Sequence, residues 1–346
     1  MRVTYFQRKP RGDGNFSIEL VFDVIRRELV RDIDARVCVA PIESNGVLGR
    51  CWIAWHARRH QGDINHVTGD TNFTALALAG KRTILTNHDC GFMARTSGLR
   101  RWLLGLIWLR LPVKHVAAVT TVSDQIKQEI IRYTGCRPEK IHVIPNAVSS
   151  EFKSVERPFN ADRPRILHVG TTPNKNLARL IEALVGLPCT LVIVGQIEDH
   201  LRRRLETASI EYENHVNLSA AELVGEYERC DLVAFASLYE GFGMPILETQ
   251  AVGRPLVTSD RLPMSEVAGQ GACLVDPEDP KAIRAGIERI LDDTDFRNQL
   301  IERGFENVTR FRAERIARQY FDLYEKVLAG ASPPYSRETA TQREVA

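Results

Sequence analysis

The feature that most constrains this fold is the stretch at residues 237–248, Ser-Leu-Tyr-Glu-Gly-Phe-Gly-Met-Pro-Ile-Leu-Glu. It follows an apolar run at residues 232–236, which is typical of a buried strand. Pro245 fits the first turn of a helix because its missing N–H would have no partner there, and Gly243 is permissive just before it. We therefore expect a strand that ends where a helix begins.

Two carboxylates lie at this corner, Glu240 in the loop and Glu248 on the expected helix. The helix start adds free N–H groups and the positive end of the helix dipole. Glu240 can accept hydrogen bonds from sugar hydroxyls, and Glu248 suits a vicinal diol such as ribose. For a lone Glu-Gly pair, an ordinary solvated loop would be the better interpretation. The whole run instead favours a corner that holds a polyhydroxylated, phosphorylated ligand.

The complete run resembles the signature of retaining glycosyltransferases of family 4. The known GT-B fold of that family is α/β, with two Rossmann-like domains facing one cleft and a last helix that crosses back to the N-terminal domain. The resemblance runs from about residue 62 to about residue 327, while the first sixty residues fit only in outline. It implies a nucleotide-sugar on the C-terminal domain. The donor contacts implied within the motif are Glu240, Gly241, Phe242, Gly243, Met244, Pro245 and Glu248.

Length and composition agree with such a protein. At 346 residues the chain exceeds the size at which a single core usually keeps growing, so two domains are expected. A net charge of +2 argues against nucleic acid as the main partner. The seven cysteines are scattered and include no Cys-x-x-Cys pair, which favours reduced cysteine over a disulfide framework or a zinc site. With no signal peptide and no apolar run of membrane-spanning length, we expect a cytoplasmic protein, or one at the inner face of the cell membrane.

Strands and helices alternate along the chain, as in a parallel sheet covered on both faces. We expect an acceptor-binding domain at residues 1–150, a donor-binding domain at 160–310, a returning helix at 311–330 and a disordered tail at 331–346. A first helix is expected at residues 16–29 and the last at 311–328. Strands are expected at residues 3–6, 36–40, 64–67, 82–86, 117–122, 141–144, 165–169, 190–194, 215–218, 232–236, 255–258 and 272–275.

Candidate acceptor-side residues follow two of the N-terminal strands. Gly12 and Gly14 lie in the loop after the first strand, at the end where open α/β sheets bind ligands. His88 and Asp89 come directly after the strand at 82–86. A lone histidine is usually structural, but the resemblance implies that His88 faces the reacting sugar. His66 has a similar position and a weaker claim.

A phosphate-binding loop is expected at the start of the second domain. Gly170 and Thr171 follow the strand at 165–169, and Lys175 lies near the next helix start, where a cation and free amides can hold a diphosphate together. The simpler alternative is a surface lysine. In the family a basic residue commonly precedes this lysine, and here it is Asn174, so the phosphates have one cation fewer. The catalytic set implied by the resemblance is Glu240, His88 and Lys175.

Metal-dependent glycosyltransferases of the other main fold use an Asp-x-Asp pair. Residues 32–34 and 293–295 match that pattern literally, but the first lies at the wrong end of the sheet and the second in a linker between helices. We interpret both as chance matches. No metal and no cofactor are therefore expected, and the nucleotide-sugar is a substrate.

A basic, aromatic stretch at residues 97–110 is too short to span a bilayer. It could lie at a membrane interface or contact a lipid-linked acceptor, or it could be a core helix with charged ends. The sequence leaves both alternatives open. The residues proposed for membrane contact are Arg100, Arg101, Trp102, Trp108 and Arg110.

Three functions compete at this point. The first is a retaining, nucleotide-sugar-dependent hexosyltransferase acting on a saccharide or lipid-linked acceptor in polysaccharide or glycolipid assembly. The second is a nucleotide-sugar epimerase or hydrolase of the same fold, which needs no acceptor. The third, a dehydrogenase or a nucleotide-binding module without catalysis, is disfavoured because no Gly-x-Gly-x-x-Gly follows a strand and because Glu240, Lys175 and His88 are all present. Donor sugar, nucleobase, acceptor, linkage and oligomeric state stay open.

Overall fold

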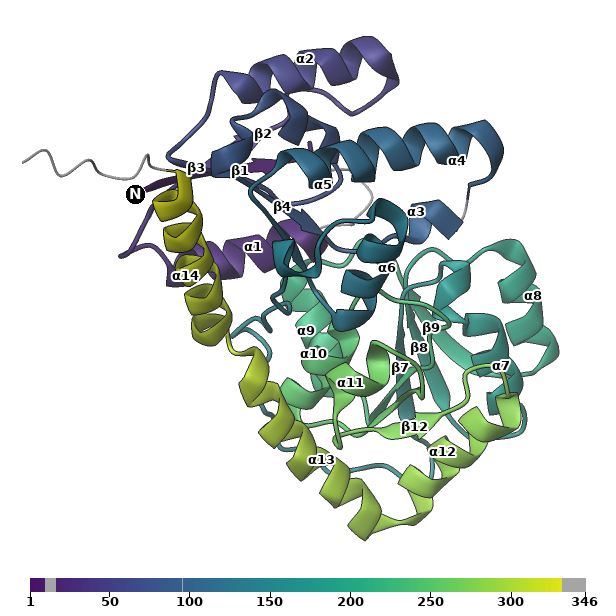
Figure 1. The fold of residues 1–346 in the computed structure, drawn as a ribbon. Coiled ribbons are helices and arrows are strands. Elements are labelled where there is room, and N and C mark those ends of the chain that lie inside the picture. The colour runs from purple at the N-terminus through teal and green to yellow at the C-terminus, as the bar shows by residue number, and fades with distance from the viewer. Residues whose placement is uncertain (10–16, 95, 332–346) are drawn as a thin grey trace, which may run out of the picture.

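The computed structural model describes residues 1–9, 17–94 and 96–331, and within them the chain forms two six-stranded parallel sheets (Figure 1). The N-terminal lobe is built on the order β2-β1-β3-β4-β5-β6. The predicted α/β class is confirmed. The strands of this lobe are β1 (Arg2–Gln7), β2 (Asp34–Val39), β3 (Ile64–Val67), β4 (Thr83–Asn87), β5 (Ala118–Thr121) and β6 (Ile141–Val143).

The C-terminal lobe is built on the order β12-β11-β10-β7-β8-β9. The middle strands of this sheet have mostly apolar sequences because helices cover both faces of the sheet. Every residue of β10 and β11 is buried. The strands are β7 (Arg165–Val169), β8 (Thr190–Val194), β9 (Glu211–His215), β10 (Leu232–Phe235), β11 (Leu256–Ser259) and β12 (Cys273–Val275).

Side-chain caps define where several helices begin. Ser123 Oγ accepts a hydrogen bond from the Ile126 amide at the start of α6, and Ser219 and Glu222 form a capping box at the start of α9. The helices of the N-terminal lobe are α1 (Ser17–Glu28), α2 (Gly46–Arg58), α3 (Gly91–Ala94), α4 (Gly98–Leu104), α5 (Leu111–His115) and α6 (Asp124–Thr134). Those that follow are α7 (Leu177–Leu184), α8 (Asp199–Thr207), α9 (Ala220–Arg229), α10 (Met244–Val252), α11 (Met264–Ala268), α12 (Pro280–Asp292), α13 (Thr294–Val308) and α14 (Ala313–Ala331).

The last helix, α14, returns to the N-terminal lobe and packs beside α1 (Figure 1). Its apolar face is the one expected from the sequence, with Ile316, Tyr320, Leu323, Tyr324 and Val327 buried against strands of the first sheet. This contact closes the core of the N-terminal lobe with residues from the far end of the chain. The predicted return of the last helix is confirmed.

Two predicted elements need correction. The strand expected at residues 215–218 is β9, which ends at His215, so residues 216–218 have already left the sheet. The alternation of Glu211, Tyr212 and Glu213 hid this strand, because it forms an edge whose outer side chains are charged. The last helix begins at Ala313 rather than Phe311, which belongs to a short 3₁₀ turn before it. The expected tail at 332–346 lies outside the described residues.

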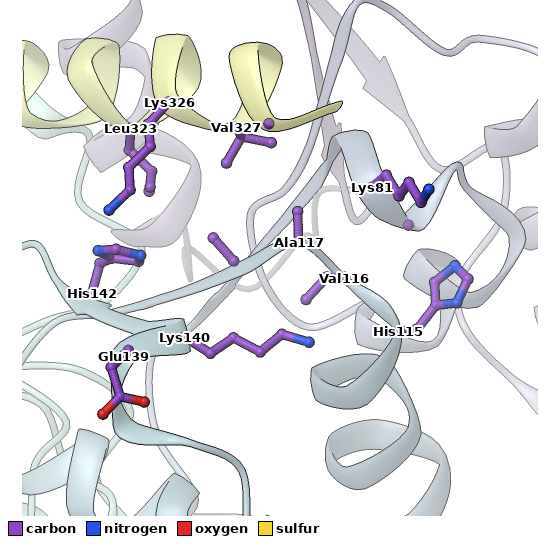
Figure 2. A pocket seen from close by; sticks show the side chains of 13 residues that line it. Lys81, His115, Val116, Ala117, Glu139, Lys140, His142, Leu323, Lys326 and Val327 are labelled. Carbon is purple, nitrogen blue, oxygen red and sulfur yellow. The ribbon is translucent and has the colours of Figure 1, made fainter. Parts of the chain in front are cut away.

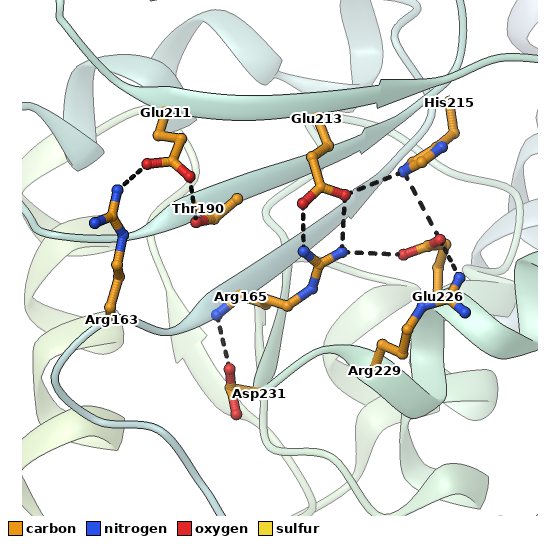
Figure 3. A network of polar contacts seen from close by, with 9 residues as sticks. All are labelled: Arg163, Arg165, Thr190, Glu211, Glu213, His215, Glu226, Arg229 and Asp231. Carbon is orange, nitrogen blue, oxygen red and sulfur yellow. Dashed lines mark hydrogen bonds and ion pairs between the residues drawn. The ribbon is translucent and has the colours of Figure 1, made fainter.

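Ion pairs cover the outer edge of the C-terminal sheet (Figure 3). Arg165 on β7 forms a two-pronged pair with Glu213 on β9, with one N–O distance of 3.0 Å, and reaches Glu226 on α9 at 3.4 Å. Arg163 pairs with Glu211 farther along the same edge. The network ties β9 and α9 to β7. It therefore fixes the segment between β9 and α9, whose residues line the cleft described next.

Candidate functional site

A cleft of about 900 Å³ lies between the two lobes, at the carboxyl ends of both sheets. This is where open α/β sheets bind ligands. All the described residues that the sequence named for catalysis, donor binding and the acceptor side line it. They are His88, Asp89, Gly170, Thr171, Lys175, Glu240, Gly241, Phe242, Gly243, Met244, Pro245 and Glu248. Gly12 and Gly14 lie outside the described residues.

A second hollow, of about 440 Å³, lies at the opposite end of the N-terminal sheet and shares no lining residue with the cleft. Figure 2 shows Lys81, Lys140, Lys326 and His142 around it, under the end of α14. These residues come from the amino-terminal ends of β5 and β6 and their surroundings. The position of strand ends therefore favours the larger cleft as the ligand site.

The motif at residues 237–248 forms the predicted corner between β10 and α10. Gly243 has φ 106°, a left-handed conformation that residues with a Cβ rarely adopt, and Pro245 occupies the first helical turn. The Phe242 side chain is buried and packs edge-on against Phe311, with ring centroids 5.8 Å apart. Only the backbone of Phe242 is therefore presented to the cleft.

Lys175 and Glu240 form an ion pair inside the cleft. Lys175 Nζ donates to Glu240 Oε1 at 2.8 Å, and only 20% and 13% of the two side chains are exposed. A Cβ on Gly170 would lie 2.9 Å from carbon atoms of the lysine stem, so the absence of a side chain there allows Lys175 to lie across the end of β7. The sequence therefore places one cation and one carboxylate in contact, although 65 residues separate them.

Asn174 occupies the place of the basic residue that the family commonly carries, and the structure gives it another contact. Its Nδ2 donates to the backbone O of Tyr239 at 3.0 Å and to Glu240 Oε1 at 3.4 Å. The side chain therefore holds the motif loop in place. Among the described residues that line the cleft, Lys175 is the only lysine or arginine, as the sequence comparison with the family implied.

Glu248 lies deeper in the cleft, on the first turns of α10. Tyr227 OH donates to Glu248 Oε2 at 2.5 Å. Burial raises the pKa of Glu248 to about 7, while the hydrogen bond from Tyr227 and the charge of Lys175 act in the opposite direction. This carboxyl thus changes its charge near neutral pH, which a solvated glutamate would not do.

His88 presents a neutral imidazole to the cleft from the end of β4. Its Nε2 donates to the backbone O of Thr68 at 2.8 Å, which leaves Nδ1 as an acceptor. Burial lowers the pKa of His88, against the raising effects of the Thr68 bond and nearby carboxylates. The ring can therefore accept a hydrogen bond from a sugar hydroxyl at neutral pH. Asp89 beside it accepts from the Gly91 amide at 2.7 Å and is exposed.

The motif loop also contacts the N-terminal lobe directly. A Cβ on Gly241 would lie 2.2 Å from the backbone O of His88, so this position needs glycine for the two lobes to approach. Ser123 Oγ donates to the backbone O of Gly241 at 3.0 Å, and Tyr239 OH donates to Glu129 Oε2 at 3.1 Å. Glu240 is thus held between two residues that bind the opposite lobe. The sequence reveals none of these contacts, because they join distant segments.

Two family models match the chain in tandem. The model described as Glycosyltransferase Family 4 matches residues 3–152, and the one described as Glycosyl transferases group 1 matches residues 149–307. The chain belongs to this glycosyltransferase family. The resemblance predicted from residues 237–248 is confirmed, and the first sixty residues, which fitted only in outline, are included in the match.

Curated relatives of this family member are named as mannosyltransferases. O-antigen chain mannosyltransferase B of Escherichia coli is 29% identical over 230 residues, which cover 60% of this chain and 60% of that protein. MMP α-(1→4)-mannosyltransferase of Mycolicibacterium hassiacum is 27% identical over 243 residues, covering 67% of this chain and 59% of that protein. The chain thus spans about 60% of the length of these two relatives.

Solved glycosyltransferases share the fold. Anabaena HepE, solved with UDP and glucose, superposes with a TM-score of 0.76 at 17% identity, covering 94% of this chain and 100% of that one. Sucrose-phosphate synthase from Thermosynechococcus elongatus gives 0.75 at 16% identity, covering 95% and 100%. The predicted two-lobed GT-B fold is confirmed.

His66, the weaker histidine candidate in this family member, is a buried structural residue. Its Nδ1 hydrogen-bonds Tyr324 OH at 2.8 Å and its Nε2 hydrogen-bonds Thr86 Oγ1 at 2.7 Å. Burial lowers its pKa to about 3. Both ring nitrogens are occupied and the residue does not line the cleft. His66 therefore joins α14 to the first sheet and has no place in the site.

The two Asp-x-Asp matches of the glycosyltransferase lie away from the cleft. Asp34 pairs with Arg2 at the amino end of β2, and Asp293 caps α13 by accepting from the Phe296 amide at 2.8 Å. Neither they nor Asp32 and Asp295 are among the described residues that line the cleft.

Four polar residues of the cleft were missed from the sequence, and one of them is Ser219, the cap of α9. Asn146 contributes from the end of the N-terminal lobe, Gln196 from the loop after β8, and Asn217 from the loop after β9. Their position directly after a strand could have indicated them in the sequence. Asparagine, glutamine and serine are also common in ordinary loops, so this position alone did not single them out. The loop after β9 lines the cleft through Val216, Asn217 and Leu218.

Proposed function

We propose that this chain is a retaining glycosyltransferase that moves a hexose from a nucleotide-diphosphate sugar to a saccharide or lipid-linked acceptor, in polysaccharide or glycolipid assembly. The observation that carries the proposal is the contact of Lys175 with Glu240 at the junction of the lobes. It puts a cation for the diphosphate and a carboxylate for the sugar hydroxyls beside the N-terminal lobe, where the acceptor would bind. Mannose is the first donor sugar to test, because the two curated relatives described above are named as mannosyltransferases.

The proposed reaction is front-side transfer. The bond between the anomeric carbon and the diphosphate oxygen breaks, and its electron pair stays on the phosphate. The acceptor hydroxyl bonds to the anomeric carbon from the same side, and its proton passes to the leaving phosphate oxygen. Lys175 and the amides around Gly243 stabilise the departing charge, while Glu240 orients the sugar as it becomes cationic. Glu248 binds the ribose, and His88 accepts from a sugar hydroxyl.

Metal-independent transfer stays a prediction. Calorimetry with the cognate nucleoside diphosphate should give the same affinity in magnesium and in chelator. A large loss of affinity on removal of magnesium would contradict it. Lys175 is the only lysine or arginine among the described lining residues, so a bound metal ion is the alternative source of positive charge for the diphosphate.

A mass-spectrometric screen tests the function itself. The protein is incubated with a panel of nucleotide-diphosphate hexoses, each with and without lipid-linked saccharide acceptors. We expect a glycosylated acceptor and free nucleoside diphosphate only when both substrates are present. Conversion of a donor without any acceptor would support the alternative, an epimerase or hydrolase of the same fold. Absence of conversion of every donor would contradict both.

We further propose that the N-terminal lobe contacts an anionic membrane or a lipid-linked acceptor. The stretch at residues 97–110 forms α4 and continues through the π-helical segment η3 (Gly105–Arg110) into α5. Leu109 and Val113 bury one face of this helical segment. The alternative of a core helix therefore accounts for that face but not for the opposite one. On the other face Leu99 is 72% and Trp102 54% exposed, beside Arg100 and Arg101.

Trp108 needs correction within this proposal. It is half-buried, with its ring 5.1 Å from that of Phe73 and under the Arg50 guanidinium at 4.5 Å. It therefore belongs to the packing between η3 and its neighbours. Arg110 remains exposed, with Nε donating to the backbone O of Tyr133 at 2.8 Å.

The helix α2, whose Arg50 lies over the Trp108 ring of η3, also carries exposed apolar side chains and was not foreseen. Its residues Val47 and Leu48 are among the most exposed apolar side chains of the described chain, and Trp52 and Trp55 stack on each other at 4.8 Å. Arg59 lies over the Trp55 ring at 3.6 Å. Exposed aromatic and leucine side chains bordered by arginine are typical of helices that lie at a bilayer interface. None of the described helices is long and apolar enough to cross a bilayer.

Vesicle co-sedimentation tests the membrane contact. Each basic residue near an anionic surface contributes about 1 kcal/mol, so replacing Arg100, Arg101 and Arg110 together by Ala should abolish weak binding to phosphatidylserine vesicles. The matched control replaces the three consecutive arginines at residues 202–204 of α8, in the other lobe. Equal sedimentation of the first variant and the parent would contradict the proposal.

A further inference from the structure

Three potential metal ligands meet between the edge strand of the N-terminal sheet and the end of α2. Cys38 comes from β2, His56 from the last turn of α2, and His60 from the turn that follows. Each offers one ligand atom, and these atoms all lie within 4.8 Å of one another. The group lies outside the donor cleft, and none of its members lines it.

The geometry of the Cys38–His56 pair matches two corners of a zinc tetrahedron. The Sγ to Nδ1 distance is 3.6 Å. With Zn–S near 2.3 Å and Zn–N near 2.0 Å, two ligands of a tetrahedral ion lie about 3.5 Å apart. The same distance fits a weak thiol-to-imidazole hydrogen bond, and a metal site needs a third ligand beside the pair. The third residue makes the difference.

His60 brings a second imidazole to the group. Its Nδ1 donates to the backbone O of His56 at 2.8 Å, which leaves the Nε2 lone pair available. Metal-binding histidines usually donate their other N–H in this manner, because the bond fixes the tautomer and the ring. The rings of His56 and His60 lie 4.3 Å apart, so both imidazoles are held on the same side of the helix end.

We propose that Cys38, His56 and His60 bind a zinc ion, with water as the fourth ligand. One thiolate and two imidazoles form a ligand set that binds zinc and cobalt in preference to magnesium and calcium. The ion joins the carboxyl end of α2 to β2 and so braces the helix that carries Trp52 and Trp55. Cysteine spacing predicted no zinc site, because the ligands come from segments that approach only in the folded chain.

Cobalt titration of the chelator-treated full chain is the test, since a cysteine-bound Co²⁺ shows a thiolate-to-metal charge-transfer band. We expect one Co²⁺ per chain, displaced by Zn²⁺, with the charge-transfer band and the intense visible bands of a four-coordinate ion. Cys38→Ser should remove the charge-transfer band, and His60→Ala should weaken binding by roughly 10²-fold. His60 is exposed, so its variant should fold as the parent does.

Cys51→Ser is the matched control, because Cys51 is an exposed cysteine on the same helix. It should keep the band and the affinity of the parent. Zinc should also raise the melting temperature of the parent and of Cys51→Ser, but not that of Cys38→Ser. The proposal is overturned if the parent takes up no cobalt. It is equally overturned if Cys51→Ser loses the band while Cys38→Ser keeps it.

Discussion

Each lobe is built on its own six-stranded parallel sheet, but the two sheets differ in the side chains that their edge strands β9 and β2 carry. In the C-terminal lobe the edge strand β9 carries Glu211 and Glu213, and both are paired with arginines (Figure 3). In the N-terminal lobe the edge strand β2 pairs Asp34 with Arg2 at its start but leaves Val37 and Val39 exposed, and the helix that follows exposes its tryptophans. Charged edges protect a sheet against unwanted pairing.

The difference teaches what each lobe faces. The C-terminal lobe satisfies its charges internally and turns a cation and two carboxylates toward the cleft, which suits a water-soluble nucleotide-sugar. The N-terminal lobe exposes several large apolar and aromatic side chains on α2 and α4, rather than isolated ones, which suits an apolar partner. Changes in one lobe should therefore affect donor chemistry, and changes in the other should affect membrane contact.

The largest effect is expected for Lys175→Ala. Lys175 faces charge that grows as the diphosphate leaves, so turnover should fall by roughly 10²-fold while donor affinity falls less. Steady-state kinetics and calorimetry on the same preparation separate the two. Lys281→Ala, an exposed lysine of the same lobe, is the control. An equal loss in vesicle binding would remove the distinction between the lobes.

Trp52→Ala tests the opposite lobe. Burying the exposed half of a tryptophan removes on the order of 100 Å² from water, and at about 25 cal/mol per Å² its loss should weaken vesicle binding by at least about 10-fold. Turnover on a water-soluble acceptor should stay at the parental level. Vesicle titration monitored by tryptophan fluorescence or sedimentation gives the affinity. Unchanged binding would show that α2 does not contact the bilayer.

Glu248 gives the donor site a pH dependence. Because burial raises its pKa to about 7, only about one tenth of these carboxyls are ionised at pH 6. Nucleotide affinity should therefore rise up to about 10-fold between pH 6 and pH 8, as the carboxylate becomes available to the ribose. Glu248→Gln should raise KM with a smaller effect on turnover and should lack this part of the pH dependence. Parallel pH profiles for the two proteins would contradict the ribose assignment.

The raised pKa of Glu248 also makes the free energy of unfolding depend on pH. Between the ordinary glutamate pKa and about 7, the folded chain binds more protons at Glu248 than the unfolded chain does. The free energy of unfolding contributed by this group therefore falls as pH rises through that window. Urea unfolding at several pH values should show a flatter profile for Glu248→Gln.

The smallest effect is expected for Arg163→Ala at the charged edge. Arg163 and Glu211 are both more than half exposed, so their ion pair should contribute under about 1 kcal/mol to the free energy of unfolding. Chemical denaturation measures it. A loss above about 2 kcal/mol would mean that the edge network acts cooperatively, and the contrast between the two edges would then be sharper.

Much of the fold could be predicted because buried parallel strands are short apolar runs. β3, β7 and β8 lie at the predicted residues. β9 was misplaced because an edge strand with Glu211 and Glu213 lacks that pattern. The candidate donor residues could be named because they lie in two short motifs, at residues 170–175 and 240–248, that resemble the family.

Contacts between distant segments could not be predicted in the same way. Gly241 against His88, and Cys38 beside His56, depend on how whole elements approach one another. The exposure of Trp52 was equally hidden, because a tryptophan on a helix is as typical of a core as of a surface.

The measurement that tests the central claim most directly is turnover of Glu240→Gln with the cognate donor and acceptor. Glu240 is held between Lys175 and the contacts of the motif loop with the N-terminal lobe. Its substitution should lower turnover by roughly 10²-fold, about the loss of one preorganised electrostatic contact, with an unchanged circular dichroism spectrum. Glu198→Gln, an exposed glutamate of the same lobe, should behave as the parent. Full turnover in a folded Glu240→Gln protein would contradict the assignment of this cleft as the site of sugar transfer.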